Sequence, residues 1–387
     1  MKKGFIVIAA VLAMACLWRA PGFPVHPSGM VYMPDIRFMF QNAFAWGAIT
    51  VFSYYLATQI NLWVGLFVVL ASFSAYYPIN TSTAERTHQL IIYGVIWYTV
   101  CVHFLNTKKA VNWILNAICI IALVNCAFLI MQGYFDYDPM HQGVPPLWGG
   151  VIDKTPNVGL MSCYNGASAM LAFCFPAFLR KRWWIGLFPL ALGLIFAHTF
   201  GGPLAIACAL TLWVFVRFRE RVYKLLFVLI VIISLFGYTK YVDKPDPGWR
   251  LKAWKFAYFK VYPQHPLFGY GLGHWKLVFK RKDVAIQTSN STSRQWHAQA
   301  HNEPIQGLVE MGILFAVVLL GYLGSVVIRA VRYLTVKCNH ILMISLMSLV
   351  AIIVVSTVFF PFHIALLAMI ALTLMAILEN SLRGRYA

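Results

Sequence analysis

The sequence predicts an all-α membrane protein: a polytopic transmembrane helical bundle of about 12 spans, with one large outer-face loop containing short amphipathic helices. The first observation is composition. Of the 387 residues, 60% are hydrophobic and only 11% are charged, and the mean hydropathy is +0.71. An ordinary soluble chain has roughly a quarter of its residues charged. The second observation is a series of long apolar runs, and the third is the placement of the basic residues.

The apolar runs match the length of a membrane-spanning helix. About 20 apolar residues cross ~30 Å of hydrocarbon, and a helix satisfies its own backbone there. Candidate spans lie near residues 4–18, 38–57, 60–77, 87–105, 111–131, 158–179, 183–200, 203–216, 225–239, 306–328, 340–360 and 362–378. Because the run at 203–216 is short, we interpret it as a tilted span or as part of a re-entrant hairpin, 183–216.

The basic residues indicate how these spans are oriented, because Lys and Arg beside membrane helices stay on the cytoplasmic side. With the N-terminus inside, the basic residues of the short loops concentrate in the inside segments 2–3, 108–109, 180–182, 217–224, 329–337 and 383–385. The run at 4–18 also resembles a signal peptide, and we interpret it as a retained helix. The cysteines show no C-x-x-C spacing, so we expect them to be packing residues.

This orientation divides the chain into three parts. Residues 1–239 hold the first spans and a short outer loop at 132–157, residues 240–305 form a large outer loop, and residues 306–387 hold the last spans and a cytoplasmic C-terminus. The Gly- and Pro-rich segment 132–157 is either a solvated loop or a rim that stacks on sugar rings.

The segment 240–305 is strongly basic on the face where positive charge is normally scarce. Such a patch implies an anionic partner. A loop held at the outer surface of a bilayer meets lipid head groups and lipid-linked phosphates first. The predicted partners are therefore membrane lipids and lipid-linked anions, and no nucleic acid.

Two sequence patterns follow each other within this loop. Residues 249–262, WRLKAWKFAYFKVY, place Trp254, Ala257, Tyr258 and Val261 at helical spacing among basic residues. This pattern predicts an amphipathic helix lying on the membrane surface. The segment PQHPLFGYGLGHW at 263–275 predicts a tight turn. Its GYGLG string is not a dinucleotide fingerprint, because no strand precedes it.

Three segments resemble the O-antigen ligases and O-antigen polymerases of bacterial envelopes. They are Arg250 with Trp254, HPLFGYGLG at 265–273, and AHNEPIQGLVEMGILF at 300–315; GLMSCYNGASAMLAFCFP at 159–176 is a weaker match. The resemblance implies an inverting, metal-independent glycosyltransferase without a cofactor, which moves a saccharide from undecaprenyl-diphosphate to an acceptor. It also implies location in the bacterial inner membrane, with the loop 240–305 and the active site facing the periplasm.

The resemblance also suggests site residues and acceptors. An outer-face histidine and arginines are functional in that family, which corresponds to His301 and Arg250 here. The family's mid-chain Ser-Arg pair is missing, since HTFGGPLAIACAL at 198–210 offers His198 and no arginine. Lipid A core is the predicted acceptor, as in lipopolysaccharide biosynthesis. The alternatives are a polymerase that joins lipid-linked repeat units, transfer to a protein hydroxyl, a transporter of lipid-linked saccharides, and a structural envelope protein.

Residue chemistry supports a site before the helix that begins near Pro304. Asn302 or Glu303 would cap this helix, whose positive end favours a phosphate. His301 could take the proton of an acceptor hydroxyl, or only bind a backbone carbonyl. Arg250 would neutralise the diphosphate leaving group, or reach a lipid phosphate as an interfacial side chain.

Glu310 is the second predicted catalytic residue. It lies inside the apolar helix, where an ionised carboxylate needs a partner. We expect it to orient a catalytic group or to pair with a cation of the loop, and a structural ion pair is the alternative. His297 and His301 are four residues apart, but a third ligand is missing, so no metal site is predicted.

The other predicted site residues have broader roles. Those expected to bind the donor diphosphate together with Arg250 are Lys252, Lys255 and Arg294. Those expected to support the site are Asn302, Trp254 and His265.

Overall fold

The computed structural model describes residues 62–76, 81–135, 160, 164–217, 220, 228–229, 248–275, 278, 300–336 and 339–386. Within these ranges every regular element is a helix, which confirms the predicted all-α class. The predicted spans at 4–18 and 38–57, nearly all of the span at 225–239, and residues 136–157 of the first outer loop lie outside the described residues.

The described helices follow the predicted apolar runs closely. The runs at 60–77, 87–105, 111–131 and 158–179 correspond to α3 (Leu62–Tyr76), α4 (Thr81–Phe104), α5 (Lys108–Phe135) and α6 (Tyr164–Phe178). The runs at 306–328, 340–360 and 362–378 correspond to α12 (Glu303–Val336), α13 (His340–Val358) and α14 (Ala365–Leu382). Hydrophobic length therefore located these helices to within a few residues at most ends.

Four of the described helices are long and apolar enough to cross a membrane: Lys108–Gln132, Glu303–Leu334, His340–Val358 and Ala365–Leu382. The hairpin predicted to be unusual is made of α7 (Leu187–Phe196) and α8 (Gly201–Arg217). α7 has 10 residues. Such a helix is about 15 Å long, half of the ~30 Å hydrocarbon core, so α7 does not span a bilayer by itself. The total of about 12 spans stays a prediction.

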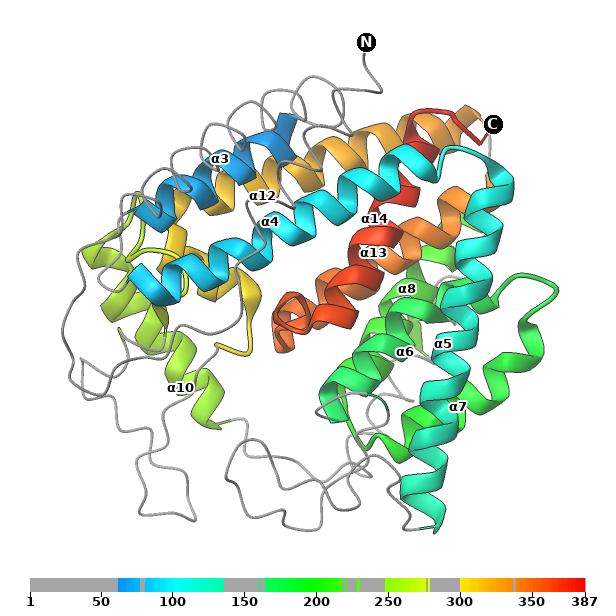
Figure 1. Ribbon diagram of the computed structural model, residues 1–387. Helices are drawn as coiled ribbons and strands as arrows, with labels where there is room; N and C mark the ends of the chain where they lie inside the picture. The colour runs from blue at the N-terminus through cyan, green and yellow to red at the C-terminus, as the bar shows by residue number, and fades with distance from the viewer. Residues whose placement is uncertain are drawn as a thin grey trace, which may run out of the picture.

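Figure 1 shows two groups of helices connected by α13 and α14. The helices α3, α4 and α12 lie along one side, and α5, α6, α7 and α8 form the other. Every residue of α6 from Gly166 to Phe178 is buried, as expected for a helix that is apolar all round. Small residues let α8 approach α6, because a Cβ on Gly202 would overlap the side chain of Ser168.

The predicted amphipathic helix is present as α10 (Gly248–Phe256), which continues into a π-helical turn, Ala257–Val261. Ala253, Ala257 and Val261 form its buried face, which packs with residues of α12 and of the loop before it. This face therefore packs on protein, and the location of the helix on the membrane surface stays a prediction. Tyr258 was assigned to the same face but is 50% exposed. The buried positions Ala253, Ala257 and Val261 recur every four residues, and Tyr258 lies outside this stripe.

Candidate active site

The loop 265–273 is inserted into a break in α12 at Gly312, where φ is 70° and ψ is −164°. In a continuous helix the N–H of Ile313 would donate to the carbonyl oxygen of Val309. Here Ile313 donates to the carbonyl of Pro266 at 2.7 Å, and Val309 accepts from the N–H of Tyr270 at 2.9 Å. The loop thus replaces both partners of the lost helical bond, so the break leaves neither group unsatisfied.

Two glycines make this insertion sterically possible. A Cβ on Gly312 would overlap the carbonyl of Leu267, and a Cβ on Gly269 would overlap the carbonyl of Glu310. Both glycines also have positive φ, of 70° and 69°, which residues with a Cβ rarely adopt. Two of the segments that carried the family resemblance, 265–273 and 300–315, therefore form one interlocked unit.

The carboxylate of Glu310 holds the far end of this loop. It accepts from the N–H groups of Gly273 at 2.9 Å and Trp275 at 3.1 Å, and from Nε2 of Gln306 at 3.1 Å. Its main-chain carbonyl accepts from Oγ of Ser74 at 3.1 Å. No cation pairs with Glu310 in the part of the chain that the structure describes, so the expected ion pair is not found there. Glu310 therefore fixes the inserted loop against α12, and its part in catalysis stays a prediction.

His301 precedes α12 in a left-handed conformation, with φ of 52°. A non-glycine residue pays a cost for this conformation, and such strain gathers at functional sites. The neighbours of His301 maintain it. The carbonyl of Ala300 accepts from Nε1 of Trp254 at 2.7 Å, and the N–H of Ala300 donates to Oε1 of Gln306 at 3.1 Å. Trp254 therefore contacts the residue before His301, and its supporting role at the site stays a prediction.

Asn302 fixes the other side of His301. Its Oδ1 accepts from the N–H of Ile305 at 2.9 Å, which is the geometry of a helix N-cap. Its Nδ2 donates to the carbonyl of Thr357 near the end of α13, at 2.8 Å. The prediction that Asn302 or Glu303 caps this helix therefore resolves to Asn302. The cap also ties the start of α12 to α13.

Arg250 contacts the last residue of α13, and His301 contacts the segment that follows it. The His301 ring lies edge-on to Phe360, with ring centroids 4.7 Å apart. Nη1 of Arg250 donates to the carbonyl of Val358 at 3.3 Å. Burial lowers the pKa of the half-buried Arg250 guanidinium from its ordinary value, and interaction with Tyr164 opposes this shift. The two predicted functional residues are thus brought to one end of the bundle, where they contact residues two apart, Val358 and Phe360.

A pair that sequence reasoning missed lies beside this segment. Nδ1 of His363 is 3.2 Å from Oε1 of Glu303. Burial alone would lower the pKa of His363, but the hydrogen bond and charge of Glu303, with the charge of Glu310, outweigh it and raise this pKa above its ordinary value. Gln306 connects the pair to Glu310, since its Nε2 lies 3.4 Å from Nε2 of His363. A histidine in the short segment 359–364 between two apolar runs was the available signal.

Other predicted site residues stand apart from this cluster. Lys252 and Lys255 are exposed on α10. His265 is also exposed, with its ring 4.3 Å from that of Tyr270. Arg294 lies outside the described residues. His198, the residue found where the family has an arginine, is exposed in the loop between α7 and α8 and has φ of 48°.

Comparison with known proteins finds a family match that includes α10 and the inserted loop. A search of curated proteins returned no match. Residues 185–320 match the family model described as O-antigen ligase. This range begins before α7, includes α10 and the inserted loop, and ends within α12. The resemblance indicated by the motifs is therefore confirmed over residues 185–320, which are similar to the O-antigen ligase family.

Proposed function

We propose that this chain is a membrane glycosyltransferase that moves a saccharide from undecaprenyl-diphosphate to a hydroxyl of lipid A core at the periplasmic face of a bacterial inner membrane. One observation carries the proposal: His301 is held in a left-handed conformation between two fixed neighbours, at the end of α13 that Arg250 also contacts. The family match supports the general class of reaction.

The proposed reaction is a single displacement at the anomeric carbon of the donor. The acceptor hydroxyl oxygen forms a bond to that carbon, the bond from the carbon to the phosphate oxygen breaks, and its electron pair leaves on the diphosphate. The hydroxyl proton passes to the neutral imidazole of His301. Attack from the face opposite the diphosphate inverts the anomeric centre.

The developing charge on the diphosphate needs compensation. The guanidinium of Arg250 matches phosphate oxygens with a planar set of donors. A phosphate beside it would also offset the cost of its burial. The N-terminus of α12, capped by Asn302, adds the positive end of a helix dipole. We propose that the exposed Lys252 and Lys255 attract the donor. Solvent-exposed charges mainly raise the rate of association with an oppositely charged ligand and contribute less to affinity.

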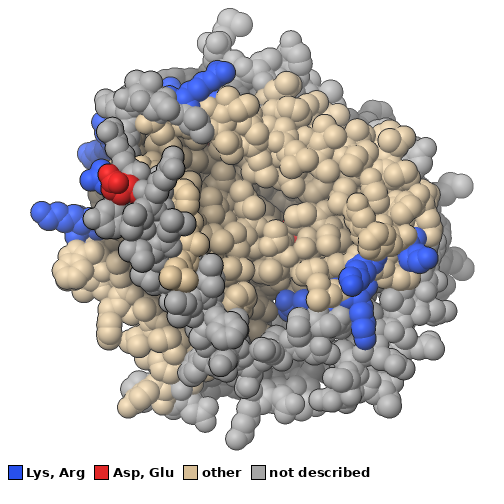
Figure 2. All heavy atoms as spheres, turned by 180° about the vertical axis from the view of Figure 1, so that it is seen from behind, with Lys and Arg blue, Asp and Glu red and all other residues tan. Residues whose placement is uncertain are grey.

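The proposed orientation agrees with the residues found at opposite ends of α6 and α13. The candidate site lies where α6 begins and α13 ends, whereas Arg180 and His340 lie where α6 ends and α13 begins. Figure 2 shows Lys and Arg at separate margins of one face, with a broad uncharged surface between them. Such a surface suits a hydrocarbon layer. In this orientation, 240–305 forms the large periplasmic loop between spans in 1–239 and 306–387.

Surface glycans of a strain lacking this chain test the proposed acceptor. Glycan chains that are complete but not joined to lipid A core, and that become joined on complementation, are the expected result. Single repeat units on lipid A core would instead indicate a polymerase, and loss of glycan from a protein would indicate a protein acceptor. Normal surface glycans of every kind would contradict all three reactions.

A further inference from the structure

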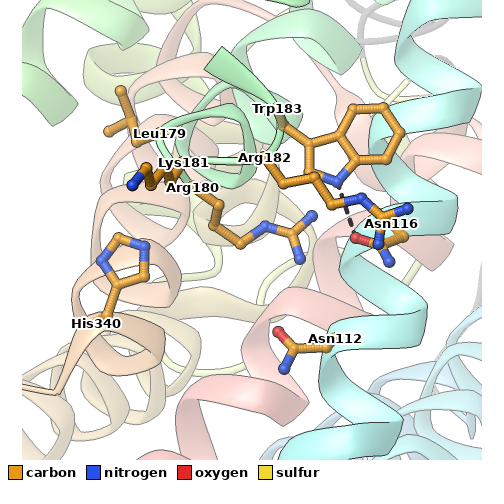
Figure 3. Close-up of a pocket in the computed structure, with 8 residues that line it drawn as sticks. All are labelled: Asn112, Asn116, Leu179, Arg180, Lys181, Arg182, Trp183 and His340. Atoms are coloured by element: carbon orange, nitrogen blue, oxygen red, sulfur yellow. Dashed lines mark hydrogen bonds between the residues drawn. The ribbon is translucent and has the colours of Figure 1, made fainter.

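A basic pocket lies at the end of the bundle opposite the candidate active site. It is bounded by the start of α5, the turn between α6 and α7, and the start of α13, and its volume is about 670 Å³. Figure 3 shows the side chains around its opening. Its lining residues are Asn112, Asn116, Leu179, Arg180, Lys181, Arg182, Trp183 and His340.

Two of these side chains are fixed by hydrogen bonds. Nε of Arg180 donates to the carbonyl of Ala177 at 2.9 Å, and its Nη2 lies 3.5 Å from Sγ of Cys119. Nε1 of Trp183 donates to Oδ1 of Asn116 at 2.8 Å, which leaves the amide nitrogen of Asn116 as a donor toward the pocket. An arginine held in this way presents its guanidinium without the entropic cost of ordering a long side chain.

The remaining polar lining is accessible from outside. Lys181, Arg182, His340 and Asn112 are all exposed. Every one of these side chains can donate a hydrogen bond, and none of the described residues that line the pocket is acidic. The pocket therefore suits an anion with several acceptor oxygens, and phosphate has that chemistry.

The surroundings of the pocket indicate a lipid as the source of the phosphate. Trp113 is 70% exposed, and Trp184, Ile185 and Phe188 are 62%, 69% and 72% exposed. Exposed tryptophans beside the ends of apolar helices are typical of the membrane–water interface. Basic pockets between membrane helices on the cytoplasmic side bind anionic head groups.

We propose that this pocket binds the phosphate head group of an anionic phospholipid, with its acyl chains lying against Trp184, Ile185 and Phe188. This site is independent of the transfer reaction. The orientation of membrane helices depends only on the charge of the flanking Lys and Arg residues. Residues with that role alone would need neither a pocket nor the two asparagines that line it.

Native mass spectrometry of the full chain, purified in detergent and incubated with phosphatidylglycerol or phosphatidylcholine, tests the proposal. We expect preferential binding of phosphatidylglycerol. The double variant Asn112→Leu with Arg182→Gln should lose at least about tenfold in affinity, the equivalent of about 1.4 kcal/mol. Arg217→Gln is the matched control, because it removes an exposed charge at the end of α8 and does not line the pocket.

The thermal midpoint without added lipid shows whether the double variant is folded, and a single variant Asn112→Leu serves if it is not. Equal binding of the two lipids would overturn the proposal, as would equal losses in the double variant and in Arg217→Gln. Inorganic phosphate raising the thermal midpoint as much as phosphatidylglycerol would also overturn it, because the pocket would then bind a soluble anion.

Discussion

The main-chain N–H of Ile313 donates to the carbonyl oxygen of Pro266 at 2.7 Å, where a continuous helix would have used Val309. This single exchange joins two segments that lie far apart in the sequence. It places the loop 265–273 inside α12, about three helical turns from His301. The position of the candidate base therefore depends on the fit of the inserted loop.

Replacing Gly312 or Gly269 by alanine should disrupt this fit. Each new Cβ would overlap a main-chain carbonyl and occupy a positive-φ position, so we expect a loss of about 1–3 kcal/mol of stability together with reduced transfer. Thermal unfolding in detergent measures the first effect. Gly324→Ala in the same helix is the control, because nothing lies within 4 Å of its Cβ position. It should leave stability unchanged or raise it by about 0.5–1 kcal/mol. A similar loss in all three variants would contradict the insertion.

His301→Gly and His301→Ala should separate strain from chemistry. Glycine adopts φ of 52° without penalty, so the glycine variant should be more stable than the alanine variant by about 1 kcal/mol. Both should lose saccharide transfer, because neither supplies a base. Thermal midpoints and product yields measured on the same preparations provide the comparison. An alanine variant that is the more stable of the two would rule out the strained backbone.

Arg250→Lys should be a severe substitution although it keeps the charge. A lysine ammonium lacks the planar set of donors that matches two phosphate oxygens. We expect the KM for the lipid-linked donor to rise on the order of tenfold. Lys260→Gln is the control, because Lys260 is exposed on the same segment and should change the KM by less than about twofold. Comparable effects of the two variants would mean that only the net charge of the loop matters.

The pair formed by His363 and Glu303 should make stability depend on pH. The pKa of His363 is raised in the folded protein, and its ordinary value is 6.5. Its contribution is therefore fully present below about pH 6.5 and is lost as the pH rises through the higher folded pKa. The groups that face His363 are Glu303, Gln306 and Glu310. His363→Gln should lower the thermal midpoint below pH 6 and have little effect above pH 8. An equal loss at both pH values would exclude this linkage.

The sequence was sufficient to predict the helices whose apolar runs are long. Hydrophobic length defines α5, α13 and α14 because a bilayer core imposes one length on every span. The break at Gly312 was not predicted, since one glycine hardly changes the mean hydropathy of a run. The break depends on a partner loop more than 30 residues away, and such pairings leave no periodic signal.

The candidate site was predictable only in part. Asn302 caps α12 as expected, because a helix cap is a local signal. The contact of Trp254 with Ala300 spans 46 residues and could not be read from local sequence. His363 was missed, since its link to Glu303 exists only once α13 and α14 place the segment 359–364 beside the start of α12. Lys252 and His265 are exposed, so their predicted roles at the site stay predictions.

The account depends most directly on His301 as the group that takes the acceptor proton. The decisive measurement is transfer from undecaprenyl-diphosphate-linked glycan to lipid A core by purified wild type and His301→Gly in lipid nanodiscs, with donor binding measured on the same samples. We predict unchanged donor binding and transfer that is slower by about 10²–10⁴-fold. Transfer by His301→Gly at the wild-type rate would contradict the proposed role of this histidine.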